Sequence, residues 1–555
     1  MTVYTPGDKQ REIIDAEDEV LVVLGGAGTG KTTTAAAAAR AHLQRRDQDR
    51  ADDGPWPRAV STQARDRVLF LSFSRASVAR ITERSRSILG PYRDRVEITT
   101  FHALAWRMIT RFGSVIDLPE PYLMSRAQSM LFSVPGTLQY KDLVPSALRT
   151  LVVPAVRSHV QARWSLIICD EFQDTNDSQY DLLERIRGDA RLLLLGDPDQ
   201  CIYAGLPDSV GVSPKRLVNA LGLPGARDIV LPDASFRDPS GVIPAAAAAI
   251  RRREFEGPAV ATAISFGRLD VFYDVDPDHE AGTVATTVEA LREQGMSVAV
   301  FSHHNDALAA LSDQLVDAGV DHDITGLSES LTSALDAQMA MAQYAAGIHD
   351  WNVVLQYLAI FVTSAIRGKN VPALAYQILG RQAGAATLQQ RLSQLQIRLG
   401  GLDPEAAFAV AADVHATIGL PSKASAWTRA GVMLKPMLAT SARAQRGHTR
   451  SAKHVLAHLD QLIADRRAAM LTEDTTETEA VVQLMNLHQT KGREADATVI
   501  VLRGNDFFGF ENDEPFEEGS RLLYVVFSRA RRRIVVLIFG TNLKSLVAPL
   551  AALAE

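Results

Sequence analysis

Residues 25–32 read GGAGTGKT. This stretch follows an apolar run at residues 20–24 and precedes the alanine-rich residues 32–43, which is the order strand, loop, helix. It matches the pattern G-x-x-x-x-G-K-[ST], and the surrounding order makes the match credible. The glycines allow backbone N–H groups to converge on phosphate oxygens at a helix N-terminus. The sequence therefore predicts a phosphate-binding loop inside an α/β domain.

The last residues of this loop supply side-chain chemistry. Lys31 is expected to bridge the β- and γ-phosphates of a nucleotide, and Thr32 is expected to hold Mg²⁺. A glycine turn that binds nothing is the structural alternative. The residues expected to contact the nucleotide are Gly25, Gly26, Ala27, Gly28, Thr29, Gly30, Lys31, Thr32 and Thr33.

A second candidate site lies at residues 165–176, which read SLIICDEFQDTN. Asp170 ends an apolar strand, where the ligand crevice of a parallel sheet lies, so its carboxylate is expected to hold Mg²⁺. Glu171 beside it is expected to orient or deprotonate an attacking water. The alternative is an acid pair on a solvated turn, and the presence of a phosphate loop in the same domain argues against it.

Apolar strands alternate with helical patterns in two parts of the chain, which predicts parallel sheets and an α/β fold class. Between residues 325 and 480 the chain is rich in Ala, Leu and Gln and is predicted to form a helical insertion. Residues 45–67 are predicted to form a surface loop. The predicted strands cover residues 20–24, 68–73, 166–169, 191–195, 270–273, 297–301, 498–502 and 532–539, and further helices cover 75–88 and 306–318.

Length and composition set broad limits. The chain has 555 residues, which favours about three or four domains. Its net charge of −7 neither supports nor excludes nucleic acid, because binding needs only a local basic track. Two cysteines without metal-ligand spacing fit a reducing compartment. With no signal-peptide core, and with residues 353–366 too short to span a bilayer, we expect a protein of the bacterial cytosol or nucleoid without membrane contact.

Further stretches in fixed order carry a family resemblance. They read TTFHALA at 99–105, DEFQDTN at 170–176, GDPDQCIYAG at 196–205, SFRDP at 235–239, VQLMNLHQTKGREAD at 482–496 and EEGSRLLYVVFSRARRR at 517–533. Together with the phosphate loop, the pattern resembles superfamily 1A helicases of the UvrD/Rep/PcrA type over nearly the whole chain. The resemblance implies ATP and Mg²⁺ as cofactors.

The resemblance also implies a domain plan with two RecA-like P-loop NTPase lobes. Lobe 1A is expected at residues 1–112 and 163–232, and lobe 2A at 233–325 and 481–555. A reduced helical insertion is expected at 113–162, and a larger one at 326–480. No fused nuclease domain is expected after the last motif.

By resemblance, five residues take roles around the nucleotide. Gln10 is expected to read the adenine edge, Glu494 to contact the ribose, and Gln200 to couple the γ-phosphate to the DNA site. Arg237 and Arg529 are expected to act as arginine fingers that neutralise charge on the transferred phosphoryl group. Since these arginines lie in the second lobe, the nucleotide is expected between the lobes. The alternatives are a solvated glutamine and surface salt bridges.

Single-stranded nucleic acid is held by charge contacts and by stacking on planar side chains. The candidates by resemblance are Phe73, Ser74, Phe101, His102, Tyr203 and His488. For Phe73 and Phe101 the alternative is core packing, and His488 is equally explained as a satisfied histidine between the lobes. The expected partners are single-stranded and tailed duplex DNA, with RNA left open.

Two stretches depart from the family pattern. Residues 204–207 read AGLP, where family members place an aromatic residue and an arginine, and Ala495 replaces a phenylalanine. Fewer planar side chains predict a weaker grip on single strands, by about 1–3 kcal/mol per lost base contact.

The resemblance implies a DNA-dependent ATPase that translocates 3′ to 5′ and unwinds duplex DNA in repair, recombination or replication. One alternative is a translocase that acts with a separate nuclease or repair protein, for example in phage defence, and unwinds weakly alone. A second alternative is an inactive nucleotide switch or scaffold.

Overall fold

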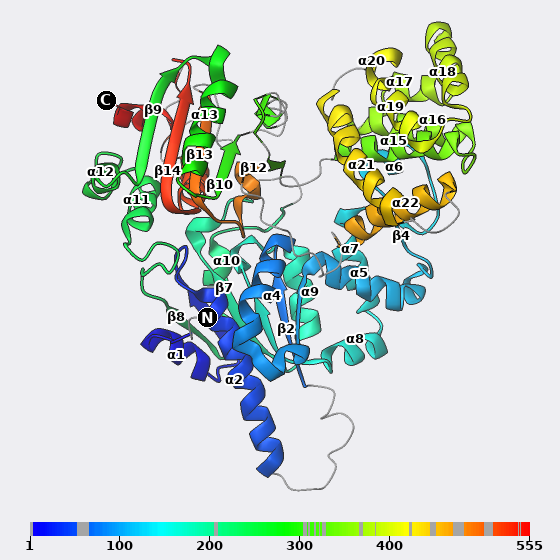
Figure 1. Ribbon diagram of the computed structural model, residues 1–555. Helices are drawn as coiled ribbons and strands as arrows, with labels where there is room; N and C mark the ends of the chain where they lie inside the picture. The colour runs from blue at the N-terminus through cyan, green and yellow to red at the C-terminus, as the bar shows by residue number, and fades with distance from the viewer. Residues whose placement is uncertain are drawn as a thin grey trace. The chain divides into compact units, whose positions relative to one another are not determined.

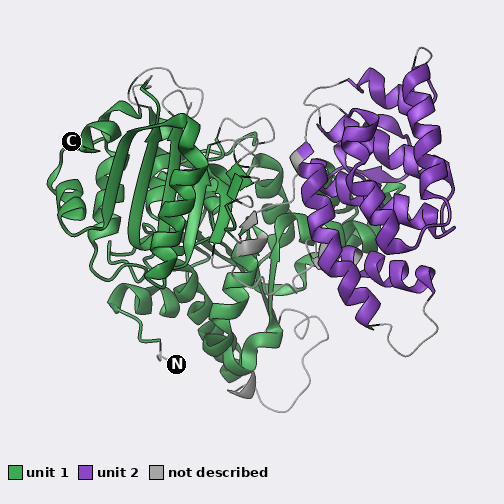
Figure 2. Ribbon diagram, turned by 45° about the horizontal axis from the view of Figure 1, so that its top comes forward, with its two compact units in different colours: residues 1–119, 141–325, 473–555 green, residues 120–140, 326–472 purple. Residues whose placement is uncertain are grey.

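The protein is described from a computed structural model that divides into two compact units (Figure 2). Unit 1 comprises Met1–Pro119, Lys141–Thr325 and Glu473–Glu555, and unit 2 comprises Glu120–Tyr140 and Gly326–Thr472. The structure describes residues 4–52, 66–204, 209–303, 329–365, 370–382, 385–420, 424–444, 451–469, 482–503, 516–541 and 546–554, with short pieces between 308 and 324 and the single residues 514 and 543.

The first sheet of unit 1 has six parallel strands in the order β3-β2-β6-β7-β1-β8. Of these strands, β2, β7 and β8 are labelled in Figure 1. Helices α2 (Lys31–Asp52) and α4 (Arg75–Leu89) pack on it, and their alanine, valine and isoleucine side chains share one core with β1 and β2. Strands covered on both faces are mostly apolar, as the fully buried β6 shows, with Ser165 as its one polar residue. The strand bounds are β1 Val20–Leu24, β2 Arg67–Ser72, β3 Val96–Thr100, β6 Trp164–Cys169, β7 Arg191–Gly196 and β8 Ala226–Val230. We call this sheet with its helices lobe 1.

The second sheet of unit 1, with its helices, is lobe 2. Its parallel strands follow the order β11-β12-β10-β13-β14-β9. Alternate residues of β10 enter different cores: Phe301 packs with α11 and α23 on one face, whereas Val300 packs with α13 on the other. The bounds are β9 Leu269–Val275, β10 Val298–Ser302, β11 Asp323–Ile324, β12 Val482–Asn486, β13 Ala495–Arg503, β14 Ala530–Phe539, α11 Val242–Arg251, α13 Glu280–Glu293 and α23 Glu517–Phe527.

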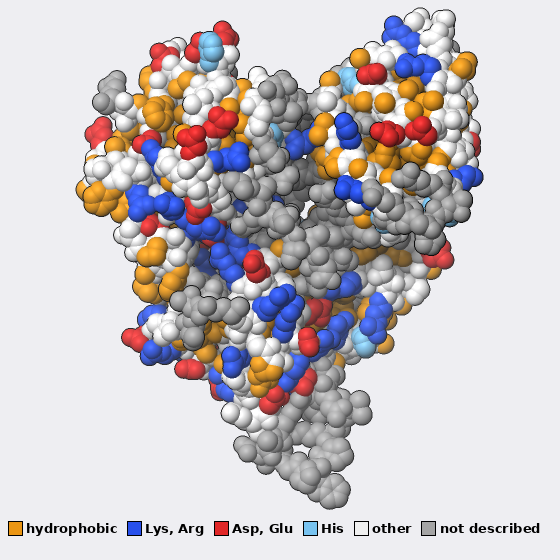
Figure 3. Space-filling view, in the orientation of Figure 1, with side chains coloured by type: hydrophobic (Ala, Val, Ile, Leu, Met, Phe, Trp, Pro, Cys, Tyr) orange, Lys and Arg blue, Asp and Glu red, His pale blue; other side chains and the backbone are white. Residues whose placement is uncertain are grey.

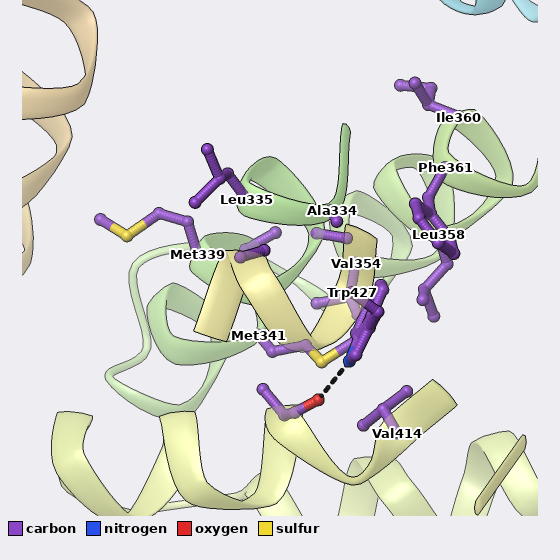
Figure 4. Close-up of a cluster of buried hydrophobic side chains, with 14 of the residues drawn as sticks. Ala334, Leu335, Met339, Met341, Val354, Leu358, Ile360, Phe361, Val414 and Trp427 are labelled. Atoms are coloured by element: carbon purple, nitrogen blue, oxygen red, sulfur yellow. Dashed lines mark hydrogen bonds between the residues drawn. The ribbon is translucent and has the colours of Figure 1, made fainter. Parts of the chain in front are cut away.

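Unit 2 is almost entirely helical and has its own apolar core. Trp427 is fully buried in that core, and its indole N–H donates to the Ala411 carbonyl at 2.9 Å (Figure 4). The ring of Phe361 meets it edge-on, with centroids 4.9 Å apart. The helices are α6 Arg126–Leu131, α15 Glu329–Ala345, α16 Trp351–Ala365, α17 Ala373–Ile378, α18 Ala386–Leu399, α19 Pro404–Ala412, α20 Val414–Ile418, α21 Ala424–Ala444 and α22 Ala452–Ala469.

The α/β fold class predicted from the sequence is confirmed. Each predicted strand is present, and most of its predicted ends lie within one or two residues of the observed ends. The loop predicted from residue 45 onward is wrong over its first part, because α2 continues to Asp52. Residues 44–52 contain good helix formers and no glycine or proline that would end the helix. The helix predicted at 306–318 lies largely outside the described residues. Among the helices that the structure describes, none is long and apolar enough to cross a membrane.

The four-part domain plan stays a prediction. In the structure, residues 120–140 belong to the same compact unit as residues 326–472. Helix α6, from the first of these segments, contributes Ala127 and Leu131 to the core of unit 2. The Ala127 N–H also donates to the carboxylate of Glu329 at 2.7 Å.

Candidate functional site

A cavity of about 480 Å³ lies in unit 1 at the carboxyl ends of β1 and β6. Ligands of open parallel sheets bind at this end of the strands. Both lobes contribute to its wall. The lining residues from the sequence predictions are Gln10, Ala27, Gly28, Thr29, Gly30, Lys31, Thr32, Thr33, Asp170, Glu171, Gln200, Arg237, Glu494 and Arg529.

The phosphate loop joins β1 to α2. Gly28 and Gly30 have φ angles of +79° and +85°, which residues with a side chain rarely adopt. A Cβ at Gly28 would also lie only 2.3 Å from the Ser235 hydroxyl. The Lys31 ammonium donates to the carbonyls of Gly25 at 2.5 Å and Gly26 at 3.0 Å. The Lys31 side chain therefore folds back onto the first residues of the loop, and the acceptors of its ammonium are uncharged carbonyls.

Gln10, the residue predicted to read adenine, lines the cavity together with Phe236. Gln10 is 5% exposed, and its amide donates to the Thr29 carbonyl at 3.4 Å, so it is not the solvated glutamine of the alternative interpretation. Phe236 is 65% exposed, and its N–H donates to the Gly28 carbonyl at 2.8 Å. An exposed ring fixed beside a glycine loop offers a flat stacking surface. Phe236 was missed from the sequence, although its place next to Arg237 was a usable signal.

Thr32 and Asp170, the two residues predicted to hold Mg²⁺, meet in the wall of the cavity. The Thr32 hydroxyl donates to Asp170 Oδ2 at 3.1 Å. Burial and the neighbouring Glu171 carboxylate raise the pKa of Asp170 to about 7. A hydroxyl and one carboxylate next to bound phosphates are the oxygen donors that Mg²⁺ prefers, so this pair fits the ion. The described residues contain no cluster of three His, Cys, Asp or Glu side chains that would hold a metal without phosphate.

Glu171 follows β6 in a left-handed conformation, with φ of 52° and ψ of 43°. Such backbone strain is held in place by the surroundings and is frequent at functional sites. Its carboxylate accepts a 2.6 Å hydrogen bond from the Gln173 amide. Burial favours the protonated form, but the positive charges of Lys491 and Lys31 outweigh it and lower the pKa of Glu171. Glu171 is thus an ionised acceptor facing the cavity.

Arg529 approaches the cavity from lobe 2. It is 3% exposed, and it donates to Gln200 Oε1 at 2.8 Å. Burial and the charge of Arg237 lower the pKa of Arg529 to about 10, so it stays charged at neutral pH. The Gln200 amide donates to Asp197 at 2.8 Å. A chain of hydrogen bonds therefore links Arg529 of lobe 2, through Gln200, to Asp197, which directly follows strand β7 of lobe 1.

Tyr524 of α23 makes a second link to lobe 1. Its hydroxyl donates to Asp197 at 3.2 Å and accepts from the Ala27 N–H of the phosphate loop at 3.4 Å. Burial raises the pKa of the Tyr524 hydroxyl, which keeps it protonated and able to donate. This residue lies in the quoted stretch 517–533, but nothing in the sequence signals its contact with the loop.

Glu494 is surrounded by four arginines. Arg237 donates to it at 2.9 Å, and Arg80 and Arg84 of α4 donate at 3.0 and 3.1 Å. Arg531 of β14 lies 3.4 Å away. Burial alone would raise the pKa of Glu494, but the arginines hold it well below its usual range. The predicted ribose contact would require Glu494 to exchange arginine partners.

Arg237 is held at both ends of its guanidinium. It also donates to the Ser528 carbonyl, and its Nε has no partner among the described residues. At 10% side-chain exposure, it is not the solvated surface salt bridge of the alternative interpretation. Basic side chains gather on the visible face of unit 1 where the lobes adjoin, despite the net charge of −7 (Figure 3).

The residues predicted to contact nucleic acid are only partly grouped. The rings of Phe73 and Tyr203 stack on each other, with centroids 4.8 Å apart, and the Tyr203 hydroxyl donates to the His488 carbonyl at 2.7 Å. Ser74 caps α4 by accepting from the Ser77 N–H at 3.1 Å.

Two other predicted contacts lie at the start of α5 (Phe101–Phe112). Phe101 is 2% exposed, so its ring packs in the core in this structure. His102 follows it and is half-buried. Of the departures from the family pattern, Ala495 is buried at the start of β13, while residues 205–207 lie outside the described residues.

Comparison with known proteins matches an AAA domain model to residues 10–206. DNA helicase II of Escherichia coli strain K12 is 22% identical over 395 residues, covering 58% of this chain and 51% of that protein. ATP-dependent DNA helicase PcrA of Leuconostoc citreum is 24% identical, covering 58% and 49%. ATP-dependent DNA helicase UvrD1 of Mycobacterium tuberculosis strain H37Rv is 28% identical over 207 residues, covering 34% and 26%. The chain thus spans about half the length of the first two relatives and less of the third.

Proposed function

Because the chain contains an AAA domain and is homologous to the UvrD/PcrA/Rep superfamily 1 DNA helicases, we propose that it hydrolyses ATP and uses the cycle to move along single-stranded DNA. The observation that carries this proposal is the shared cavity. Lys31 and Glu171 of lobe 1 line it together with Arg237 and Arg529. A nucleotide bound there contacts both lobes at once.

In the proposed complex, Gln10 reads the adenine edge and Phe236 stacks on its face. The amides of residues 27–33 hold the phosphates, and Thr32 and Asp170 hold Mg²⁺. When bound there, the ion would supply positive charge that neutralises the phosphates of the nucleotide. Each of these contacts uses a side chain or amide that already faces the cavity.

Hydrolysis then needs an oriented water and a neutralised phosphoryl group. Glu171 accepts a proton from the attacking water, because its carboxylate is ionised and held by Gln173. Arg237 and Arg529 neutralise the charge that develops on the γ-phosphate. Gln200, bonded to Arg529, turns with that arginine when the γ-phosphate leaves.

Movement follows from the difference between the ATP and ADP complexes. ATP offers Arg237 and Arg529 a γ-phosphate to bind, and ADP does not, so hydrolysis weakens the contact between the lobes. The finer proposal is translocation from 3′ to 5′ with duplex unwinding, and its polarity rests on the resemblance of the sequence motifs alone. The Mg²⁺ and DNA requirements are part of the same proposal.

A strand-displacement experiment tests this function. ATPase rate and unwinding are measured with 3′-tailed, 5′-tailed and blunt DNA duplexes, and with a 3′-tailed RNA duplex. We expect ATPase activity stimulated by single strands and unwinding of the 3′-tailed DNA. No ATP turnover at saturating DNA and Mg²⁺ would contradict the proposal and favour an inactive nucleotide switch.

A second candidate is a translocase that needs a separate nuclease or repair protein. Two observations favour it. The rings of Phe73 and Tyr203 stack on each other, so each covers a face on which a base could stack, and the ring of Phe101 is buried. Such a surface offers few free rings to grip a strand. DNA-stimulated ATPase activity without strand displacement in the experiment above would select this candidate.

A further inference from the structure

Lys491 is a buried cation with no role in the function proposed so far. It follows the turn η7 (Leu487–Thr490) of lobe 2, and its side chain is 2% exposed. Its ammonium donates to the carboxylate of Asp174 in lobe 1 and lies 3.9 Å from Glu171 Oε2. A lysine so deeply buried is retained only when its charge is paired.

The acidic partners of Lys491 belong to one short segment. Asp174 ends the turn η4 (Phe172–Asp174), which begins directly after Glu171. The Asp174 side chain is 0% exposed, and its Oδ1 has no partner among the described residues. Lys491 is therefore the group of lobe 2 that anchors the turn carrying the proposed water-activating acid.

Lys491 also contacts the side chains of Phe73, Tyr203 and His488, which we call the aromatic group, through the ring of Tyr203. Its ammonium lies 5.4 Å from the ring centroid of Tyr203, within the range of a cation–π contact. Tyr203 stacks on Phe73 and donates to the carbonyl of His488. His488 lies within η7 and Lys491 directly follows that turn, so Tyr203 and His488 are joined to Lys491 over a short path.

We propose that Lys491 is a positioning residue that couples DNA bound at Phe73, Tyr203 and His488 to the placement of Glu171. This inference rests on the proposed function. Binding of a DNA strand shifts the aromatic group and the η7 turn. The Lys491 ammonium, which is bonded to Asp174, then moves the η4 turn and with it the adjoining Glu171. Lys491 thereby makes ATP hydrolysis depend on DNA, without contact with either ligand's reacting atoms.

The test measures coupling rather than activity alone. Lys491→Met keeps an unbranched side chain that is one atom shorter and removes its charge, and Lys215→Met at an exposed lysine of lobe 1 is the matched control. Binding of a fluorescent ATP analogue, kcat and KM are measured with and without an oligothymidylate strand. We expect Lys491→Met to bind the analogue within about twofold of the unaltered protein and to lose DNA stimulation of kcat by roughly tenfold or more.

Since removal of one partner of a buried ion pair destabilises a fold, a second variant is needed. Lys491→Arg keeps the charge in a different geometry, and thermal unfolding establishes that it is folded. We expect it to retain part of the DNA stimulation. DNA stimulation within twofold of the unaltered protein in both variants overturns the inference, as does an equal loss of the basal and stimulated rates. An unaltered protein without DNA-stimulated ATPase activity overturns the proposed function itself.

Discussion

The nucleotide cavity and the aromatic group differ in where their functional side chains point. In the cavity, Lys31 and Glu171 line a space that a ligand can enter. In the aromatic group, Phe73 and Tyr203 stack on each other, and Tyr203 also bonds to the His488 backbone. Apart from Glu494, which would have to exchange arginine partners, the cavity is thus arranged before its ligand binds, whereas the aromatic group must open to receive a base. Preorganised groups lose less free energy on binding, so the two regions should respond differently to substitution.

Glu171→Gln should have the largest effect on that comparison. The amide keeps the size of the side chain but cannot accept a proton from water, so ATP binding should persist while turnover falls by about 10²–10⁴-fold. Single-turnover hydrolysis and binding of a fluorescent ATP analogue measure the two separately. Glu256→Gln, at an exposed glutamate, is the control. Turnover at the unaltered rate would remove the role of Glu171 in activating water.

Lys31→Ala should lower turnover by roughly 10²–10³-fold and weaken nucleotide binding as well, since the ammonium lies across the phosphate loop. This combined loss separates Lys31 from Glu171, whose substitution spares binding. Equilibrium binding of ATP and ADP, with steady-state hydrolysis, provides the measurement, and Lys215→Ala is the control. Normal turnover in Lys31→Ala would show that the loop does not hold the phosphates.

The contrast between these regions also separates what the sequence could predict from what it could not. Lys31, Thr32, Asp170 and Glu171 follow apolar strands in short local patterns, and parallel topology brings strand ends together. Those patterns depend only on neighbours in the chain.

The contacts between the lobes depend on residues far apart in the chain. Lys491 pairs with Asp174 across 317 positions, and Arg80 pairs with Glu494 across 414. A lone lysine or arginine carries no local sign of such a partner. For Phe101 the resemblance implies a ligand contact, which stays a prediction, and the sequence alone could not decide that the ring is buried in this structure.

Glu494→Gln should have an intermediate effect, on stability rather than chemistry. The amide leaves Arg80, Arg84, Arg237 and Arg531 without their shared counter-charge. Glu494 is 6% exposed, but two of its partners are about a third or more exposed, so solvent screens part of the cost. We expect a loss of about 1–3 kcal/mol at neutral pH, measured by thermal or denaturant unfolding beside Glu256→Gln.

The same substitution predicts a pH dependence with a definite sign. The folded-state pKa of Glu494 lies below its ordinary value of 4.5, so its stabilisation is present above that value and is lost as the pH falls through the folded-state pKa. The difference in unfolding temperature between the unaltered protein and Glu494→Gln should therefore be constant near neutral pH and shrink at strongly acidic pH. A difference that grows on acidification would contradict the assigned charge state.

Tyr203→Ala should have the smallest effect, because its ring is already in contact with Phe73 and with the Lys491 ammonium and offers little surface to a base. Stacking of one base contributes about 1–3 kcal/mol, and we expect the lower end of that range, about fivefold in affinity for an oligothymidylate strand. Tyr203→Phe keeps the ring and removes the bond to His488, so it separates stacking from the hydrogen bond. Affinity is measured by fluorescence anisotropy over a range of salt concentrations, and it should fall with salt equally in all three proteins, because neither substitution removes a phosphate contact. A hundredfold loss of affinity in Tyr203→Ala would instead mean that the Tyr203 ring is already placed to stack on a base before DNA binds. The aromatic group would then be preorganised like the cavity, and the contrast between the two regions would disappear.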